Sequence, residues 1–264
     1  MPTASRKLLQ AVERAVIQAR PLALKHFRTS NLRIERKADQ SPVTAADRAV
    51  EERLRRVLSR LCPGETIVGE EFGRSGNSTD TYWTIDPIDG TRAFSRGLPT
   101  WCIMVGKVER GRPVLGVCDF PSLGTTIAVA PGVAAYERTG RVRKRLLKVS
   151  APPPLKDCVI FHGGANWWNQ SPHAKGFHAL ISRCYLERAF GDCYGFLWAL
   201  RGYADIVIEY GVKVWDMVPL AALAHATGRV LVNVRNKPSW MGPDTIMAHP
   251  ELASQAAKLL RRPA

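Results

Sequence analysis

The stretch that decides the fold is YWTIDPIDGT, residues 82–91. Its first four residues favour a β-strand, and Pro87 is expected to end this strand directly after Asp86, because proline cannot donate to a strand ladder. The Asp-Gly pair at residues 89–90 then turns the chain, and Thr91 can begin a helix. The sequence therefore predicts two carboxylates held three residues apart on a stiff turn.

This turn has a functional and a structural interpretation. If the side chains of Asp86 and Asp89 converge they form a cation site, and the amides of Gly90 and Thr91 at a helix start favour an anion. The alternative is an ordinary surface turn, since Asp-Pro and Asp-Gly are common turn dipeptides. A calcium loop of the EF-hand type fits poorly, because Gly97 stands where the closing glutamate belongs. These residues alone leave the choice open.

Two further stretches accompany this one, GEEFG at residues 69–73 and VWDMVPLAAL at residues 214–223. In this order the three motifs resemble those of the inositol monophosphatase family, metal-dependent phosphatases of small phosphate monoesters. The resemblance covers nearly the whole chain. It implies an α/β fold, a layered αβαβα sandwich of the inositol monophosphatase and fructose-bisphosphatase type, with an α+β N-terminal lobe and an α/β C-terminal lobe.

A chain of 264 residues with 45% hydrophobic composition can bury a sizeable core. We expect one catalytic unit, residues 1–264, built from two lobes. The Pro-rich stretch Ala151 to Pro154 is too short for a flexible tether, so it marks a seam between residues 1–150 and 151–264.

Apolar spacing in the N-terminal half predicts helices at residues 5–19 and 41–61, with Pro21 kinking or restarting the first one. A strand is expected at residues 66–68, and a flexible polar loop at residues 73–80.

Further along, β-rich runs separated by Gly and Pro predict an antiparallel meander at residues 101–109, 112–119 and 124–130. The last third alternates strand and helix, which is typical of an α/β lobe. Its expected strands are 157–162, 185–189, 205–209, 229–234 and 245–248, and its expected helices are 173–182, 193–201 and 215–227, with a closing helix. Ligands gather at strand ends in such sheets, where Glu209 and Asp216 fall.

The charge is strongly positive, since 38 Lys and Arg against 23 Asp and Glu give +15. Nucleic-acid affinity must therefore be considered. The densest cluster, residues 138–148, predicts a hairpin with a basic outer face, and no aromatic stacking pattern, zinc finger or RNA-binding signature accompanies it. We expect a solvated basic surface that attracts phosphorylated substrates, and no nucleic-acid partner.

The six cysteines form no C-x-x-C pair, which argues against a zinc ribbon or a dithiol redox site. The N-terminal helix pattern lacks the apolar core of a signal peptide, and no apolar run approaches membrane-spanning length. We expect a cytoplasmic protein with free thiols and no membrane association. Walker A, G-x-G-x-x-G and G-x-S-x-G motifs are also absent, so a kinase, dehydrogenase or serine hydrolase is not indicated.

The acids of the remaining motifs each have a structural interpretation. Asp47 stands three residues after Thr44, the spacing of a helix capping box. Asp192 and Asp216 fall at helix starts and could be caps, and Glu209 could be a solvated strand end.

The resemblance implies functional roles instead. It pairs Asp47 with Thr91 to orient a water, and it makes Glu70 a metal ligand with Glu71 behind it. The implied metal ligands are Glu70, Asp86, the carbonyl of Ile88, Asp89 and Asp216. The implied phosphate contacts are Asp89, Gly90 and Thr91.

An oxygen-only ligand set suits Mg²⁺, and we expect two ions with a transient third near Glu70. Four carboxylates against two Mg²⁺ sum to zero, so the dianionic phosphate requires the additional positive character of the Gly90 and Thr91 amides. The expected mechanism is in-line attack by a metal-activated water, with Glu70, Thr91 and Asp47 as the catalytic residues.

The stretches GDCYG at residues 191–195 and GLPTW at residues 97–101 resemble the histidinol-phosphate phosphatase branch of the family. This implies substrate contacts from Arg188, Asp192 and Glu209, and the two acids would attract the ammonium group of an amino alcohol. We therefore expect an enzyme that hydrolyses L-histidinol phosphate to L-histidinol in histidine biosynthesis. The family resemblance also implies a homodimer. The alternatives are an inositol-1-phosphate phosphatase and, from another class, a basic nucleic-acid-binding protein on a degenerate phosphatase fold. The intact acids argue against the last.

Overall fold

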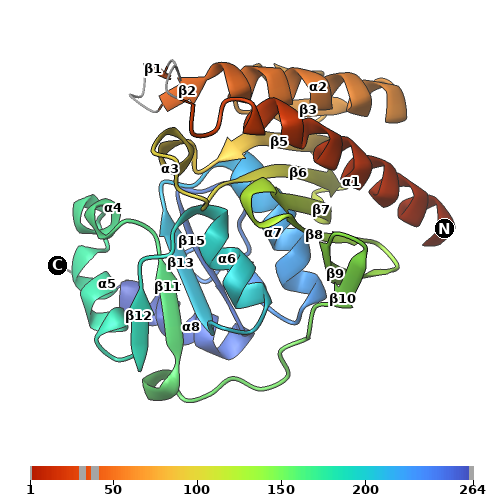
Figure 1. Ribbon diagram of the computed structural model, residues 1–264. Coiled ribbons are helices and arrows are strands. Elements are labelled where there is room, and N and C mark those ends of the chain that lie inside the picture. The colour runs from red at the N-terminus through yellow and green to blue at the C-terminus, as the bar shows by residue number, and fades with distance from the viewer. Residues whose placement is uncertain (1, 30–33, 37–41, 262–264) are drawn as a thin grey trace. The chain divides into compact units, whose positions relative to one another are not determined.

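The computed structural model describes residues 2–29, 34–36 and 42–261 (Figure 1). Ser41, the expected start of the second helix, lies outside these ranges. The chain divides into two compact units, Met1–Arg145 and Leu146–Ala264, and each is described by itself. The division falls a few residues before the Pro-rich stretch at 151–154.

Two helices of the first unit, α1 (Pro2–Leu24) and α2 (Ala45–Leu61), pack on each other and on a sheet. Helix α1 continues through Pro21, contrary to the predicted restart, and the Lys25 amide donates to the Pro21 carbonyl at 3.0 Å. Both helices bury apolar residues at helical spacing. That stripe includes Leu9, Val12, Val16 and Ala19 of α1, and Val50, Leu54 and Leu58 of α2.

Helix α2 begins at Ala45, later than expected, because Thr44 caps it. The Thr44 hydroxyl accepts a hydrogen bond from the Ala46 amide at 3.2 Å. The residues just before the cap form a short strand, β2 (Pro42–Thr44), which pairs antiparallel with β1 (Ile34–Arg36).

The sheet of the first unit has eight strands in the order β10-β9-β8-β7-β6-β5-β3-β4. Their bounds are β3 (Thr66–Gly69), β4 (Gly73–Ser75), β5 (Tyr82–Asp89), β6 (Cys102–Glu109), β7 (Arg112–Phe120), β8 (Thr125–Ala130), β9 (Val133–Thr139) and β10 (Val142–Arg145). A 3₁₀ turn, Pro121–Leu123, joins β7 to β8. Strands β3 and β5 are parallel, and β5 through β10 pair antiparallel in sequence. The three predicted strands of the meander are confirmed as β6, β7 and β8.

Strand β5 does not end at Asp86, and the predicted stop at Pro87 is wrong. Pairing with β6 continues to Asp89, but the register shifts between Asp86 and Asp89. Proline is tolerated inside a strand at such an irregularity, where no ladder hydrogen bond is required of it.

The polar stretch at residues 73–80 begins as a strand rather than a loop. Strand β4 pairs antiparallel with β3, so that Val68 lies opposite Arg74. All three of its residues are exposed, and it forms the edge of the sheet. Edge strands that are short and charged carry no apolar pattern from which they could be predicted.

The second unit is built on a five-stranded sheet in the order β12-β11-β13-β15-β14. The strands are β11 (Val159–His162), β12 (Leu186–Arg188), β13 (Ile206–Tyr210), β14 (Val230–Val232) and β15 (Asp244–Ala248), and the helices are α4 (Ala165–Gln170), α5 (Ala174–Ile181), α6 (Asp192–Leu200), α7 (Val214–Ala226) and α8 (Pro250–Leu260). A 3₁₀ turn, Leu155–Asp157, precedes β11. The alternation is that predicted, except that α4 is additional. Strands β12, β11 and β13 are parallel, so their carboxyl ends meet at one edge.

Helices cover both faces of this second sheet. Ile160 of β11 belongs to the core that α5 and α8 close, whereas the neighbouring Phe161 lies against Gly195 of α6. Successive strand residues point to opposite faces, so α6 lies on the face opposite to α5 and α8. Helix α7 packs on α6 and on β14. The first unit thus has a helical layer on a sheet, and the second has a sheet between two helical layers.

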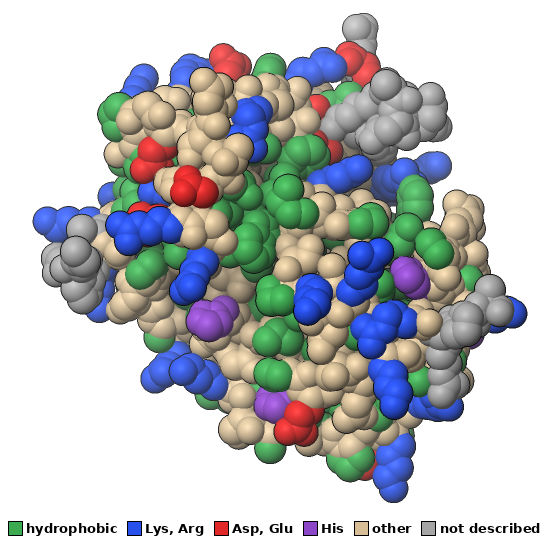
Figure 2. All heavy atoms as spheres, turned by 180° about the vertical axis from the view of Figure 1, so that it is seen from behind, with side chains coloured by type: hydrophobic (Ala, Val, Ile, Leu, Met, Phe, Trp, Pro, Cys, Tyr) green, Lys and Arg blue, Asp and Glu red, His purple; other side chains and the backbone are tan. Residues whose placement is uncertain are grey.

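A hairpin is confirmed in the basic region, but its bounds differ from the predicted 138–148, because β9 and β10 pair within residues 133–145. All four residues of β10 are exposed. Figure 2 shows one face on which Lys and Arg side chains are dispersed among neutral and hydrophobic ones. None of the helices within the described ranges combines the length and apolarity needed to cross a bilayer.

Candidate functional site

Asp86 and Asp89 stand on either side of the irregularity that ends β5. An oxygen of Asp86 lies within 4.8 Å of an oxygen of Asp89. Asp86 is buried, and its Oδ1 accepts the amide hydrogen of Ile88 at 3.0 Å, which fixes the turn between the two acids. The bulge therefore lets two acids of one strand converge, which regular alternation three residues apart would not allow.

The turn after Asp89 depends on Gly90, whose φ of 84° is the left-handed conformation that glycine adopts without strain. Thr91 then begins the short helix α3 (Thr91–Ser95). Its hydroxyl donates to the Ile88 carbonyl at 2.9 Å. The hydroxyl thus lies beside the carbonyl oxygen that the sequence singles out as a metal ligand.

An aromatic cluster supports α3 from behind. The rings of Phe94 and Trp101 pack edge to face at 4.9 Å, and Phe27 lies 5.4 Å from Phe94 and 5.3 Å from Trp101. Phe94 and Trp101 are fully buried. Such pairs contribute about 0.5–1.5 kcal/mol each beyond the burial of their area, so the turn is held on a rigid base.

Asp47 of α2 has both of the contacts that the sequence left as alternatives. Its Oδ2 accepts from the Thr44 amide at 2.8 Å and from the Thr44 hydroxyl at 2.6 Å, which is the capping box. Its Oδ1 lies 3.4 Å from the Thr91 hydroxyl. Burial, with a smaller contribution from the Glu70 charge, raises the pKa of this carboxyl to about 6 against the lowering effect of the Thr44 hydrogen bonds.

Glu70 follows β3 and is anchored to the strand that carries Asp86. Its amide donates to the carbonyl of Ile85, the residue directly before Asp86, at 3.2 Å. Glu70 also contributes to raising the pKa of the Asp47 carboxyl, so the two acids are within electrostatic reach of each other. The first unit therefore joins its predicted site residues Asp47, Asp86, Ile88, Asp89, Gly90 and Thr91 on and against the end of β5. Glu70 is attached to the same strand through its backbone amide.

In the second unit, Asp216 is the third residue of α7. Its Oδ2 accepts from the Lys213 amide at 2.8 Å, so the helix-capping alternative describes one of its oxygens. Asp47 occupies the same place at the start of α2, with the same 2.8 Å contact to a capping amide. A carboxylate at this position still presents its second oxygen for another contact.

Glu209 lies on β13, and its side chain fits against two glycines. A Cβ on Gly163 would lie 1.9 Å from Glu209 Oε2, and a Cβ on Gly191 would lie 3.3 Å from Glu209 Oε1. Gly163 follows β11, and Gly191 lies between β12 and α6. Glu209 is buried, and it stands at the shared carboxyl edge of the parallel strands.

Asp192 and Arg188 flank this edge. Asp192 is exposed and begins α6 with a φ of 55°, a left-handed conformation that is uncommon for aspartate. The helix is capped at Gly191, so Asp192 is not the cap residue. Arg188 ends β12, and its guanidinium donates to the Glu187 carbonyl at 2.7 Å. The second unit thus places Arg188 at the end of β12, Asp192 at the start of α6 and Glu209 near the end of β13.

Two side-chain contacts of buried residues, one in each unit, are not evident from the sequence. His162 Nε2 lies 2.8 Å from Glu187 Oε2 at the carboxyl end of β11. In the first unit, the buried Glu51 accepts the amide hydrogens of Glu71 and Phe72. The sequence shows two adjacent glutamates at positions 51 and 52 on a helix, without a signal that distinguishes the buried one.

The chemistry of the first unit's site follows from these donors. Carboxylate and carbonyl oxygens are ligands for hard divalent cations. Asp86 and Asp89, with oxygens within 4.8 Å, could therefore hold a metal ion. Neither thiols nor imidazoles are needed for such a site.

Comparison with known proteins agrees with this geometry. A family model described as the inositol monophosphatase family matches residues 5–262. A histidinol-phosphatase of Mycobacterium tuberculosis is 35% identical over 208 residues, which is 79% of this chain and 80% of that protein. A histidinol-phosphatase of Streptomyces coelicolor is 30% identical over 216 residues, which is 80% of this chain and 81% of that protein.

The solved structure of an inositol monophosphatase from Zymomonas mobilis superimposes with a TM-score of 0.83 at 26% identity, covering 97% of this chain and 98% of that one. The expected fold is thereby confirmed. The chain belongs to the inositol monophosphatase family and is a phosphoric monoester hydrolase.

Proposed function

We propose that the protein is a Mg²⁺-dependent phosphatase that hydrolyses L-histidinol phosphate to L-histidinol. The observation that carries the substrate assignment is the placement of Glu209 and Asp192 about Gly191, at the carboxyl edge of the second sheet. Two carboxylates there complement the ammonium group of an amino alcohol. The relatives named histidinol-phosphatase, at 35% and 30% identity, support the same substrate.

The proposed metal ligands are Glu70, Asp86, the Ile88 carbonyl, Asp89 and Asp216. Two Mg²⁺ ions, with a transient third near Glu70, fit an oxygen-only set. When bound, Mg²⁺ supplies positive charge that stabilises the attacking and leaving oxygens of the phosphoryl transfer. The residues of both units would then act as one catalytic unit over residues 1–264.

The chain's own residues position the reacting groups. Thr91 carries one hydroxyl hydrogen, which lies within reach of the Ile88 carbonyl at 2.9 Å and of Asp47 Oδ1 at 3.4 Å. With the Ile88 carbonyl engaged as a metal ligand, the Asp47 carboxylate would accept this hydrogen, so that a lone pair of Thr91 Oγ1 could accept a hydrogen from the attacking water. This orients the water's oxygen toward phosphorus, with Glu70 beside it. The amides of Gly90 and Thr91 donate to the phosphate oxygens.

Recognition of the alcohol part falls to Arg188, Asp192 and Glu209. Glu209 and Asp192 would hold the ammonium group, and Arg188 would flank the substrate from β12. An uncharged inositol ring needs only hydrogen bonds, so two acids are of less use to it. Inositol 1-phosphate is nonetheless the second candidate, because the solved inositol monophosphatase at 26% identity has the same fold over nearly the whole chain.

The cellular setting is also part of the proposal. The six cysteines, all within the described residues, form no disulfide bond, which suits a reducing compartment, and we propose a cytoplasmic homodimer. The dispersed basic side chains of Figure 2, together with the intact acids of the motifs, favour an enzyme over a nucleic-acid-binding protein.

The test is phosphate release from L-histidinol phosphate and from inositol 1-phosphate, each with Mg²⁺ and with a chelator, and with Asp89→Asn as the inactive control. We expect Mg²⁺-dependent turnover of L-histidinol phosphate, with inositol 1-phosphate far slower. A preference for inositol 1-phosphate would overturn the ammonium contact and keep the metal chemistry. Metal-independent turnover would overturn the chemistry itself.

A further inference from the structure

A buried glutamate on α2 holds the backbone that follows Glu70. The Glu51 side chain is fully buried. Its Oε2 accepts the Glu71 amide hydrogen at 2.7 Å, and its Oε1 accepts the Phe72 amide hydrogen at 3.2 Å. Both of its oxygens are therefore engaged with the two peptide units directly after Glu70.

The residue before Glu70 makes this contact possible. A Cβ on Gly69 would lie 2.0 Å from Glu51 Oε1 and 2.5 Å from its Cδ, closer than any side chain could stand. Glu70 itself is fixed on the other side, where its amide donates to Ile85 in the strand that carries Asp86. Glu70 is thus held from β5 on one side and from α2 on the other.

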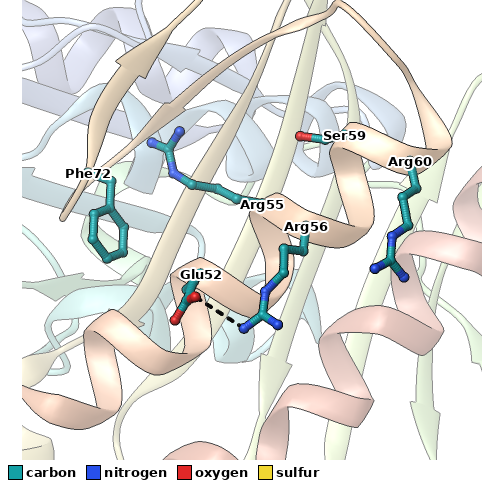
Figure 3. A pocket seen from close by; sticks show the side chains of 6 residues that line it. All are labelled: Glu52, Arg55, Arg56, Ser59, Arg60 and Phe72. Atoms are coloured by element: carbon teal, nitrogen blue, oxygen red, sulfur yellow. Dashed lines mark ion pairs between the residues drawn. The ribbon is translucent and has the colours of Figure 1, made fainter.

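Arg55 completes the arrangement one helical turn after Glu51. Its Nε donates to Glu51 Oε1 at 2.7 Å, and its guanidinium also binds the Gly73 carbonyl and, at 3.3 Å, the Ser75 hydroxyl. Figure 3 shows Arg55 reaching from α2 toward the Phe72 segment, in a surface hollow of about 550 Å³. The charge of the buried glutamate is therefore balanced, and the turn is closed on its outer side.

Glu52, the residue after Glu51 on α2, has a different environment. The Glu52 side chain is 62% exposed and pairs with Arg56, which is 61% exposed, along the helix surface (Figure 3). By contrast, Asp47, one turn before Glu51, is buried and contacts Thr91. Helix α2 therefore presents two buried carboxylates on one face, one to each motif of the site.

We propose that Glu51 is a positioning residue for metal binding. By fixing the amides of Glu71 and Phe72, it sets the direction in which the Glu70 carboxylate points, without itself touching metal or substrate. The inference rests on the proposed function, in which Glu70 is a metal ligand. Groups that orient a ligand in this way typically change metal affinity by about 10–100-fold when they are replaced.

The experiment compares Glu51→Gln with its matched neighbour Glu52→Gln. Mg²⁺ binding to the metal-free protein is measured by calorimetry, and the Mg²⁺ concentration for half-maximal turnover is measured separately. We expect the Mg²⁺ dissociation constant and the half-maximal Mg²⁺ concentration each to rise about tenfold or more in Glu51→Gln, with a smaller change in kcat at saturating Mg²⁺. Both quantities should stay unchanged in Glu52→Gln.

Further variants separate positioning from charge and from folding. Glu51→Asp keeps the charge but is one methylene too short, so we expect it to resemble Glu51→Gln. Gly69→Ala keeps Glu51 but displaces its carboxylate, so it should also weaken Mg²⁺ binding. This variant takes the place of Glu51→Gln in the experiment if Glu51→Gln proves too unstable to measure. In a Glu70→Gln background, Glu51→Gln should weaken Mg²⁺ binding little further, because the two act through one ligand.

Wild-type Mg²⁺ affinity in both Glu51→Gln and Gly69→Ala would overturn the inference, as would fully additive effects of Glu51→Gln and Glu70→Gln. Failure of the proposed function is distinguishable, because the wild-type protein would then neither bind Mg²⁺ nor release phosphate from L-histidinol phosphate.

Discussion

Asp47 Oδ1 lies 3.4 Å from the Thr91 hydroxyl, although the two residues are 44 positions apart in the chain. The other oxygen of the same carboxylate accepts the Thr44 amide hydrogen at 2.8 Å. One side chain therefore caps the start of α2 and also reaches Thr91 in the turn after β5. The capping and site interpretations of Asp47 do not exclude each other.

Replacing Asp47 by Asn should separate these two contacts. The amide oxygen of Asn can still accept from Thr44, whereas its NH₂ group donates to Thr91 rather than accepting from it. We expect the fold to persist and kcat to fall about 10²–10⁴-fold, the range for loss of acid–base assistance. Turnover of Asp47→Asn equal to that of the wild type, at saturating Mg²⁺, would contradict the role proposed for Asp47.

The raised pKa of Asp47 predicts how the stability of the metal-free protein varies with pH. Burial raises the pKa of Asp47 in the folded state to about 6 from 3.8. The protonated carboxyl therefore contributes to the free energy of unfolding below pH 4, and this contribution is lost as pH rises through about 6. Relative to Asp47→Asn, the wild-type free energy of unfolding should fall by up to about 3 kcal/mol over this range. Denaturant unfolding of both proteins in chelator at pH 4 to 7.5 measures this difference in unfolding free energy. Parallel plots of unfolding free energy against pH for the two proteins would refute the prediction.

The elements around the site were largely predictable, because strands and helices here carry clear apolar periods. The end of β5 was not. Pro87 reads as a stop, but a register shift between Asp86 and Asp89 lets the strand continue, and such shifts depend on pairing with β6. The acids that converge across this bulge were nonetheless identifiable from the motif.

Buried charges are the part that the sequence does not reveal. Glu51 and Glu52 are adjacent acids on one helix, yet one is fully buried and the other 62% exposed. What separates them is the partner each meets, two backbone amides for Glu51 and an exposed arginine for Glu52. Those partners come from a turn whose path is set by the sheet and not by local sequence.

Adding Mg²⁺ should raise the melting temperature of the protein. Asp86 and Asp89 bring two carboxylates within 4.8 Å, and a bound cation removes their repulsion. At 100 times its Kd, a ligand of the folded state stabilises by about 2.7 kcal/mol. For a domain of this size that corresponds to roughly 5–10 °C, measured by scanning calorimetry with and without chelator.

The variant Asp89→Asn tests the cause of this stabilisation. Without metal it should melt above the wild type, because one repelling charge is gone, and Mg²⁺ should then shift it little. An unchanged wild-type melting temperature at millimolar Mg²⁺ would argue against the metal site.

The ion pair between Arg20 and Asp119 should be a major stability determinant of the first unit. Arg20 of α1 contacts both oxygens of the buried Asp119, at 2.7 and 2.5 Å, and Thr126 donates to the same carboxylate. Arg20→Met leaves that charge without its guanidinium, which should cost about 3–5 kcal/mol of unfolding free energy. Arg48→Gln, in the exposed pair with Glu35, is the control and should leave the melting temperature unchanged.

The contact between Gly163 and Glu209 gives the sharpest test of the substrate assignment. In Gly163→Ala the new Cβ would lie 1.9 Å from Glu209 Oε2, so the carboxylate must move. If Glu209 holds the substrate's ammonium group, its displacement loses a charged hydrogen bond of about 1.5–3 kcal/mol, and KM for L-histidinol phosphate should rise roughly 10–100-fold. Hydrolysis of glycerol 2-phosphate, which has no ammonium group, should change far less.

Gly164→Ala is the matched control for this variant. Its Cβ would meet only Trp167, at 3.0 Å, and that side chain is 43% exposed and can turn aside. Wild-type kinetics are therefore expected of it. An equal loss on both substrates in Gly163→Ala would mean that Glu209 supports the site's structure and not the ammonium group, whereas a loss confined to L-histidinol phosphate ties the buried glutamate to the cationic end of the substrate.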